Sequence, residues 1–119
     1  MKVLVVDDFA RMRRIVKKLL KQIGFTKIVE ADDGTTALAV IKKQEIGLIL
    51  ADWNMPKMSG LELLKAVRSD ESIENTPFVM VTAEAQKSAV LEAVQAGVSN
   101  YIVKPLTGDV IKEMLTEIL

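Results

Sequence analysis

The 119-residue chain contains no cysteine and no histidine. Without cysteine, neither disulfide bonds nor thiolate-bound zinc can hold the fold, which must therefore depend on the burial of apolar side chains. Without histidine, the most common general base of enzymes is missing. Half of the residues are apolar, which suffices for one packed core, and the chain is too short for two ordinary domains. We therefore expect a single domain over residues 1–119.

Net charge and long apolar runs are also absent. The 16 basic side chains balance the 16 acidic ones, so the chain as a whole is not suited to bind a polyanion, and any electrostatic function must be local. The apolar runs are far shorter than the roughly 20 residues that a membrane span needs, and we expect no cleavable leader before the first of them. We expect a cytoplasmic protein that binds neither a membrane nor nucleic acid directly.

Four short apolar runs each end at a residue that can take part in chemistry. The runs cover residues 3–6, 48–51, 78–81 and 101–103, and they lead into Asp7 and Asp8, Asp52, Thr82 and Lys104, respectively. Runs of this kind, separated by amphipathic helical patterns, are typical of the strands of a parallel sheet covered on both faces. Because open parallel sheets bind ligands at the carboxyl ends of their strands, we expect these side chains to converge on one pocket.

Helical periodicity fills the segments between the strands. The clearest helix has apolar residues at three- and four-residue steps over residues 12–23, and Gly24 follows as a stop signal. A further strand is expected at residues 27–30, and further helices at or around residues 37–41, 61–67, 85–96 and 110–118. Five strands alternating with five helices predict an α/β sandwich with right-handed crossovers.

Asp7, Asp8 and Asp52 would bring three carboxylates together. Two carboxylates about 5 Å apart repel each other by about 3 kcal/mol at an effective dielectric constant near 20, so a positive charge must lie among them. Lys104 supplies one such charge. An all-oxygen cluster without imidazole or thiolate suits a hard cation, and a site with few protein ligands favours Mg²⁺ over Ca²⁺. The sequence therefore predicts a Mg²⁺ site.

Each of these residues also has a simpler explanation when it is taken alone. An aspartate at a strand end commonly caps the next helix, as Asp7 or Asp8 could, and an acid before a turn, such as Asp52, is ordinary. Thr82 could be a β-branched strand residue, and Lys104 a solvated loop charge. Only their equivalent places at the ends of the strands favour a shared site.

Several runs of sequence surround these residues. They are Asp7-Asp8-Phe9, Met12-Arg13-Arg14-Ile15-Val16, Asp52-Trp53-Asn54-Met55-Pro56, Gly60-Leu61-Glu62-Leu63-Leu64-Lys65, Met80-Val81-Thr82-Ala83-Glu84-Ala85 and Val103-Lys104-Pro105. In these runs, from Val3 to the last residue, the chain resembles the response-regulator receiver family and, more closely, its single-domain chemotaxis regulators of the CheY type. The resemblance implies a flavodoxin-like three-layer sandwich of five helices and a five-stranded parallel sheet, with strand order 2-1-3-4-5. The three acids would lie where that order reverses.

The resemblance also implies roles for the residues at this point. Asp52 would be the nucleophile that accepts a phosphoryl group, and it would bind Mg²⁺ together with Asp8. Asp7 would hold the ion through a water molecule, and the main-chain carbonyl of Asn54 would complete the ligands.

A second group of residues would respond to the phosphoryl group. By the same resemblance, Lys104 and the main-chain amides of Asn54 and Ala83 would hold its oxygens. The hydroxyl of Thr82 would move to join them, and the ring of Tyr101 would fill the space that it leaves. This movement would alter the surface formed by the fourth helix, the fifth strand and the fifth helix.

The resemblance thus implies a phosphorylation-activated signalling switch of a two-component chemotaxis pathway, with Mg²⁺ as its cofactor, and not a turnover enzyme. Its partners would be a histidine-kinase phosphodonor, a flagellar-motor switch protein and a phosphatase, and we expect a monomer. Three alternatives stay open. A Mg²⁺-dependent aspartyl-phosphate phosphatase normally carries a second acid two residues after its nucleophile, where this chain has Asn54. The chain could also be a receiver domain excised from a longer regulator, or a binding module with a vestigial pocket.

Some features depart from the family pattern or lie outside the site. Ser59 stands where close relatives often carry an acid, and Leu106 replaces a common phenylalanine, which affects fine tuning more than chemistry. The peptide between Lys104 and Pro105 is expected to be cis by resemblance.

A basic segment without an acid contains Arg11, Arg13, Arg14, Lys17, Lys18 and Lys21. Such a segment is more often a solvated face or a site for an acidic protein partner than a nucleic-acid site.

Overall fold

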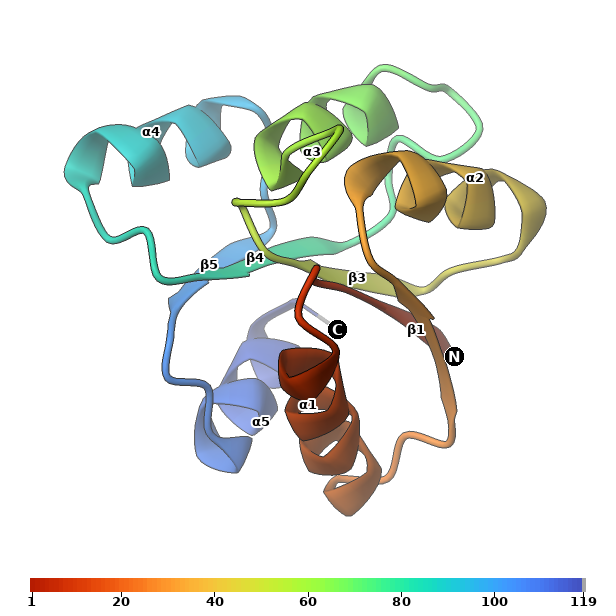
Figure 1. Cartoon of the computed structure of the whole chain (residues 1–119), viewed down its shortest axis with the longest axis vertical. Coiled ribbons are helices and arrows are strands. Elements are labelled where there is room, and N and C mark those ends of the chain that lie inside the picture. The colour runs from red at the N-terminus through yellow and green to blue at the C-terminus, as the bar shows by residue number, and fades with distance from the viewer. Residues whose placement is uncertain (119) are drawn as a thin grey trace.

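The computed structural model describes residues 1–118, in which a parallel sheet carries helices on both faces (Figure 1). The strands are β1 (Lys2–Val6), β2 (Lys27–Ala31), β3 (Leu48–Ala51), β4 (Phe78–Thr82) and β5 (Asn100–Val103). Their order is β2-β1-β3-β4-β5, and every neighbouring pair is parallel. The predicted strand order is confirmed. Leu119, the last residue of the predicted domain, lies outside the described residues.

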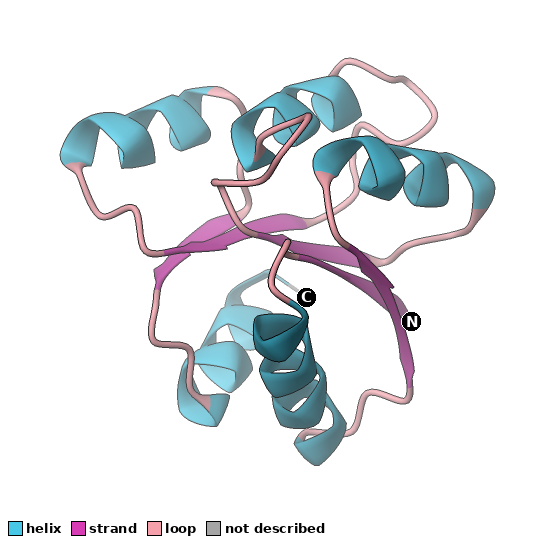
Figure 2. Ribbon diagram, viewed as in Figure 1, coloured by secondary structure: helices cyan, strands magenta, loops and turns pink. Residues whose placement is uncertain are grey.

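Helices form the outer two layers. They are α1 (Ala10–Gln22), α2 (Gly34–Lys43), α3 (Gly60–Arg68), α4 (Lys87–Gln95) and α5 (Gly108–Ile118). Helices α1 and α5 cover one face of the sheet, and α2, α3 and α4 cover the other (Figure 2). The predicted start of the fourth helix at residue 85 is wrong by two residues, because Gln86 keeps an extended conformation and is the N-cap residue of α4.

The core has one apolar layer on each face of the sheet because side chains alternate along a strand. Val3 and Val5 of β1 pack in the layer beneath α1 and α5, and Leu4 and Val6 pack in the layer beneath α2 and α3. All four are almost completely buried. Burying a valine or leucine side chain contributes about 1.5–3 kcal/mol, so the strands that carry the polar residues are rigidly held.

The same alternation decides which face each polar strand-end residue occupies. Asp7, Asp52 and Lys104 each follow, by two residues, a side chain of the layer beneath α1 and α5. Thr82 instead follows Met80 by two residues, and Met80 belongs to the opposite layer. The sheet therefore places Asp7, Asp52 and Lys104 together and leaves Thr82 on the side of α3 and α4.

Local capping fixes the helices that border this edge of the sheet. At α2, the Asp33 carboxylate accepts a hydrogen bond from the Thr36 amide at 2.8 Å. At α3, Ser59 forms a capping box with Glu62, because the Ser59 hydroxyl accepts from the Glu62 amide and the Glu62 carboxylate accepts from the Ser59 amide.

Among the described residues, no helix is both long and apolar enough to cross a membrane.

Candidate functional site

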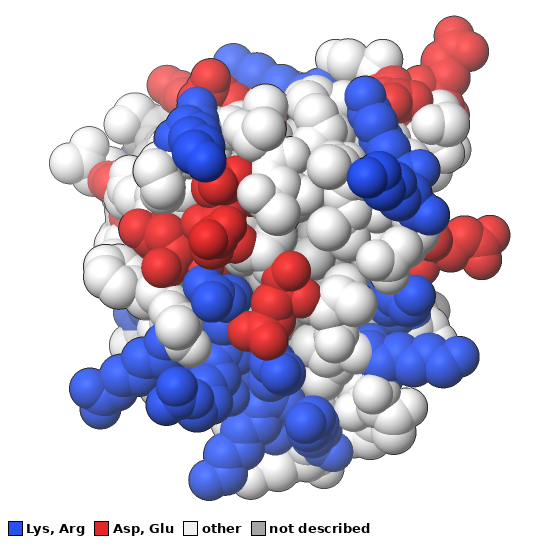
Figure 3. Space-filling view, turned by 45° about the vertical axis from the view of Figure 1, so that its right-hand side comes forward, with Lys and Arg blue, Asp and Glu red and all other residues white. Residues whose placement is uncertain are grey.

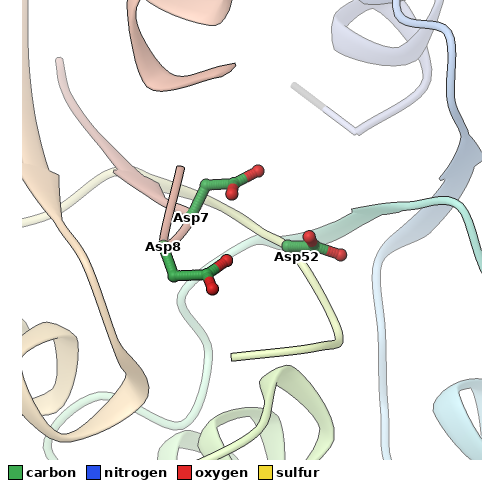
Figure 4. A group of neighbouring side chains, drawn as sticks. All are labelled: Asp7, Asp8 and Asp52. Carbon is green, nitrogen blue, oxygen red and sulfur yellow. The ribbon is translucent and has the colours of Figure 1, made fainter. Parts of the chain in front are cut away.

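Three carboxylates meet at the carboxyl ends of β1 and β3. One oxygen from each of Asp7, Asp8 and Asp52 lies within 4.8 Å of the others. Figure 4 shows Asp7 and Asp8 at the end of β1 beside Asp52 at the end of β3. Asp7 and Asp52 are buried, while Asp8 is exposed. The structure therefore brings together the three acids that the sequence predicts to be neighbours.

Lys104 joins this cluster from the loop after β5. Its ammonium nitrogen lies 3.2 Å from Asp7 Oδ2 and 3.2 Å from Asp52 Oδ2. The side chain is only 17% exposed, so both ion pairs are shielded from water. The predicted convergence of the three acids and Lys104 is confirmed. The Thr82 hydroxyl, which the sequence also assigns to this pocket, bonds to the Glu84 amide instead, and its part in the pocket stays a prediction. The cis peptide expected between Lys104 and Pro105 is also present.

Burial and charge act in opposite directions on the ionisation of these groups. Burial lowers the pKa of Lys104, but the carboxylates of Asp52 and Asp7 outweigh this effect, and the pKa of Lys104 is raised. For Asp7, burial is the largest effect and raises the pKa, although the Phe9 amide and Lys104 both oppose it. The raised pKa of Asp7 therefore reflects the removal of its carboxylate from water, which the Phe9 amide and Lys104 offset only in part.

Main-chain amides hold the second oxygen of each buried acid. Asp52 Oδ1 accepts a hydrogen bond from the Trp53 amide at 2.7 Å, and Asp7 Oδ1 accepts one from the Phe9 amide at 3.0 Å. Because Lys104 contacts the other oxygen of each carboxylate, both side chains have a fixed orientation. Sequence reasoning did not identify the amides of Phe9 and Trp53, since these contacts depend on the backbone and not on the side-chain type.

The start of α3 packs closely against the main chain of Asp52. A Cβ atom at Gly60 would collide with the main-chain carbonyl oxygen of Asp52 and would lie 2.9 Å from Met80 Sδ. The Gly60 amide donates to the Trp53 carbonyl at 2.8 Å. Glycine is needed at this position because any side chain would displace the segment that carries Asp52.

Thr82 and Tyr101 are linked to each other through the main chain of Glu84. The Thr82 side chain is fully buried, and its hydroxyl accepts from the Glu84 amide at 3.3 Å. The Tyr101 hydroxyl donates to the Glu84 carbonyl at 2.7 Å, and its ring packs edge-on against Trp53 with centroids 6.5 Å apart. Burial raises the pKa of Tyr101, and the charges of Glu84 and Asp52 add to this effect. Tyr101 is therefore neutral, and its ring contacts Trp53, the residue that follows Asp52.

Asn54 and Ala83, whose main-chain atoms the sequence assigns to ligand binding, are exposed at the ends of β3 and β4. They lie in the loops that follow Asp52 and Thr82. The roles of their main-chain atoms stay predictions.

One residue that borders the acids was predicted only as part of a basic surface. Arg13 Nη1 donates to the main-chain carbonyl of Asp7 at 2.6 Å, and Arg13 Nε pairs with Glu30 at 3.0 Å. Lys17 pairs with the same Glu30 at 3.0 Å. The helix that carries Arg13 has no acid in its first turn, and a cation there opposes the helix dipole. Arg11 lies in the same turn, so this placement does not by itself single out Arg13, whose contact with a main-chain carbonyl becomes visible only in the structure.

The cluster has the charge and the ligand atoms of a site for a hard divalent cation. Three carboxylates face the single ammonium of Lys104, which leaves two formal negative charges. All the acidic ligand atoms are oxygens, which Mg²⁺ and Ca²⁺ prefer. The acids could therefore hold a metal ion. Figure 3 shows acidic side chains clustered next to a large group of basic side chains in the lower part of the molecule, where α1 lies in Figure 1.

An acidic cluster with an opposing lysine, at the point where a parallel sheet of order 2-1-3-4-5 reverses, defines the class of protein. The family model "Response regulator receiver domain" matches residues 3–116. The chain therefore belongs to the response-regulator receiver family. The match extends beyond the strand ends that carry the acids and includes all ten helices and strands, in whole or in part.

Within this family the sequence is of the type found in chemotaxis. The chain is 52% identical over 118 residues to the chemotaxis protein CheY of Pseudomonas aeruginosa, with 99% of this chain and 95% of the relative covered. It is also 52% identical to the chemotaxis protein CheY-3 of Vibrio cholerae, covering 99% and 91%. A crystal structure of the V. cholerae chemotaxis protein CheY4 matches with a TM-score of 0.91 and 35% identity, covering 99% of this chain and 98% of that one. The chain is a chemotaxis-type response-regulator receiver, which is a class of signalling protein.

Proposed function

We propose that the chain acts as a phosphorylation switch whose phosphoryl acceptor is Asp52. The observation that carries this proposal is the state of the Asp52 carboxylate, which is buried beside two other acids and fixed between Lys104 and the Trp53 amide. A fixed, shielded carboxylate is a better nucleophile than one that is free in water, because less reorganisation precedes attack. Lys104 then offers a cation for the oxygens of the incoming group.

The metal that this reaction needs is Mg²⁺, and this chain would hold it with acidic and main-chain oxygens. Asp8 and Asp52 would bind it directly, with the main-chain carbonyl of Asn54, and Asp7 would bind it through water. When bound, the ion would neutralise the charge of the acids and of the phosphoryl oxygens. The two formal negative charges that Lys104 leaves on the cluster support a divalent ion.

Transfer would form a bond between phosphorus and a carboxylate oxygen of Asp52. The bond between phosphorus and the donor would break, and the donor would keep its electron pair. Lys104 and the amides of Asn54 and Ala83 would hold the phosphoryl oxygens. The acceptor changes from one negative charge to about two, which increases its attraction for Lys104 and for hydroxyl donors.

The output of the switch would pass through Thr82 and Tyr101. Their hydroxyl groups bond to the amide and the carbonyl of the same residue, Glu84. If the Thr82 hydroxyl turns to a phosphoryl oxygen, it releases the Glu84 amide, and the segment that anchors Tyr101 is free to move. The charge added at Asp52 would thereby change the position of the Tyr101 ring.

The surface that responds would be formed by α4, β5 and α5. Leu91 and Val94 of α4 are more than half exposed, and Val103 of β5 is 44% exposed. Exposed apolar side chains on the elements next to and including the strand of Tyr101 suit a protein partner. We assign a flagellar-motor switch protein to this surface, a histidine kinase as phosphodonor, and a phosphatase as a further partner. A single receiver domain in a cytoplasmic monomer is part of the same proposal.

Reaction with acetyl phosphate and Mg²⁺, followed by intact-mass measurement, tests the proposal. We expect the parent protein to gain the mass of one phosphoryl group, and the Asp52→Asn variant to gain none. Asp32→Asn is the matched control, since Asp32 is an exposed acid at the end of the neighbouring strand β2 and is not in the cluster. Full labelling of Asp52→Asn would move the acceptor elsewhere. Continuous release of phosphate without a labelled protein would favour the phosphatase alternative.

A further inference from the structure

Arg13 connects the first helix to the backbone of the acidic cluster. Its guanidinium Nη1 lies 2.6 Å from the main-chain carbonyl oxygen of Asp7, which makes a short, charge-assisted hydrogen bond. Its Nε lies 3.0 Å from the Glu30 carboxylate of β2. The side chain is 18% exposed. Arg13 thus spans α1, the end of β1 and the edge strand β2.

Helix physics alone does not favour a cation at this place. Arg13 is the fourth residue of α1, and the first turn contains no acid to balance it. The N-cap residue, Phe9, makes no side-chain hydrogen bond to the helix. Cations are disfavoured near the positive end of the helix dipole, and residues that break a local rule often serve a site. The contact with Asp7 gives Arg13 such a role.

Holding the Asp7 carbonyl also fixes the direction in which the chain continues. The peptide unit between Asp7 and Asp8 is planar, so the orientation of this carbonyl sets the position of the Asp8 Cα atom. Asp8 is the exposed member of the cluster, and the ion pairs of Lys104 are with Asp7 and Asp52 instead. The Asp8 carboxylate therefore depends on its backbone for its place.

We propose that Arg13 is a positioning residue of the metal site, which holds the Asp7–Asp8 peptide so that the Asp8 carboxylate faces the ion. This inference rests on the proposed function. Arg13 bonds to the main chain that carries two of the three acids, and it would act on the metal site through that backbone. Some groups do not bind a metal themselves but hydrogen-bond to the residues that do. Removing such a group lowers metal affinity by about 10–100-fold.

Glu30 makes this arrangement compatible with cation binding. A lone guanidinium next to the acids would repel a second cation, but Glu30 pairs with Arg13 and with Lys17. The hydrogen bond from Lys17, with the one from Arg13, keeps the pKa of Glu30 below its ordinary value. Glu30 stands opposite Val5 in the pairing of β1 with β2, so its position is set by the sheet.

Positioning and simple electrostatics predict opposite results when Arg13 is removed. If Arg13 acted only as a nearby positive charge, its loss would strengthen Mg²⁺ binding, because a repulsion would disappear. If Arg13 holds the peptide, its loss weakens Mg²⁺ binding, because Asp8 is then free to point elsewhere. The sign of the change in affinity therefore separates the two explanations.

The experiment is urea unfolding of the parent, Arg13→Ala and Arg14→Ala at increasing Mg²⁺ concentration. A ligand that binds only the folded state stabilises it by RT ln(1 + L/Kd), where L is the free ligand concentration, so the rise of the midpoint with Mg²⁺ concentration gives the Mg²⁺ affinity, and the midpoint without Mg²⁺ gives the stability of the metal-free protein. We expect Arg13→Ala to need about ten-fold more Mg²⁺ than the parent for the same rise. Arg14→Ala should match the parent, since Arg14 is an exposed neighbour on the same helix.

A second variant separates the donor from the charge and keeps the test valid if Arg13→Ala does not fold. Arg13→Gln retains a side-chain donor without a charge, and we expect a Mg²⁺ affinity between those of Arg13→Ala and the parent. If Arg13→Ala and Arg13→Gln bound Mg²⁺ as tightly as the parent or more tightly, the positioning role of Arg13 would be wrong, while the proposed metal site would stand. A parent whose midpoint does not respond to Mg²⁺ would overturn the proposed metal site and, with it, this inference.

Discussion

Gly60 shows how a residue without a side chain can determine the geometry of the site. A Cβ atom there would collide with the Asp52 carbonyl oxygen, and Met80 Sδ blocks the other direction. Neither atom can shift without a cost in stability, because the Asp52 oxygen belongs to the backbone and Met80 is fully buried in the core. The close approach of α3 to β3 therefore supports the position of the Asp52 carboxylate.

We predict that Gly60→Ala lowers the free energy of unfolding by about 1–3 kcal/mol through overpacking. The variant should also label more slowly with acetyl phosphate, because the Asp52 segment is displaced. Gly108→Ala is the control, since a Cβ atom at the start of α5 meets no atom within 4 Å. Urea unfolding and the labelling rate measure both effects. Parental stability together with parental labelling of Gly60→Ala would contradict the assignment of Gly60 to the site.

The sequence predicted the charged residues of the site better than their supports. Asp7, Asp52 and Lys104 follow apolar strands, and the common direction of parallel strands makes their convergence predictable. Arg13 could not be assigned in the same way, because its contact is with a main-chain carbonyl that no sequence pattern identifies. The Trp53 amide escaped prediction for the same physical reason.

At the scale of elements, the start of α4 is the clearest error of sequence reasoning. The segment from Ala83 to Gln86 has good helix formers, which favoured a helix from residue 85. In the structure, the Glu84 amide bonds to Thr82 and the Glu84 carbonyl bonds to Tyr101, so neither is available to a helix. Tertiary contacts with a distant strand override local propensity here. The strands were predicted well because their apolar runs directly reflect burial on both faces.

Capping of α2 gives a pH dependence with a definite sign. The Thr36 amide lowers the pKa of Asp33, helped by Lys57 at 3.6 Å. A lowered pKa in the folded state means that the charged cap stabilises the fold above the unfolded pKa of about 4, and that this stabilisation is lost as the pH falls through the folded pKa. Asparagine caps a helix about as well as aspartate, but without charge.

We therefore predict that Asp33→Asn is less stable than the parent at pH 7 by about 0.3–1 kcal/mol, the usual contribution of an acid at a helix N-terminus. The difference should shrink as the pH falls below the unfolded pKa of about 4 and disappear once the pH is below the lowered pKa of Asp33 in the folded state. Urea unfolding of both proteins across this range measures it. A difference that stays constant with pH would show that the charge of Asp33 does not stabilise α2.

At the scale of the whole molecule, a zero net charge conceals a strong local separation. The acids of the site lie where β1 and β3 end. Figure 3 shows a large group of basic side chains in the lower part of the molecule next to clustered acidic ones. Arg13 and Glu30 join the two regions. Composition could exclude a general polyanion-binding role, but it could not reveal this separation, because it depends on how the chain folds.

The proposed switch depends on a metal ion that lets Asp52 carry a phosphoryl group. A crystal structure determined with Mg²⁺ and beryllofluoride, which imitates a phosphoryl group on a carboxylate, tests this most directly. We predict beryllofluoride on Asp52, contacted by Lys104, and Mg²⁺ bound by Asp8, Asp52 and the carbonyl of Asn54. A well-ordered structure in which neither group occupies the acidic cluster would contradict the account.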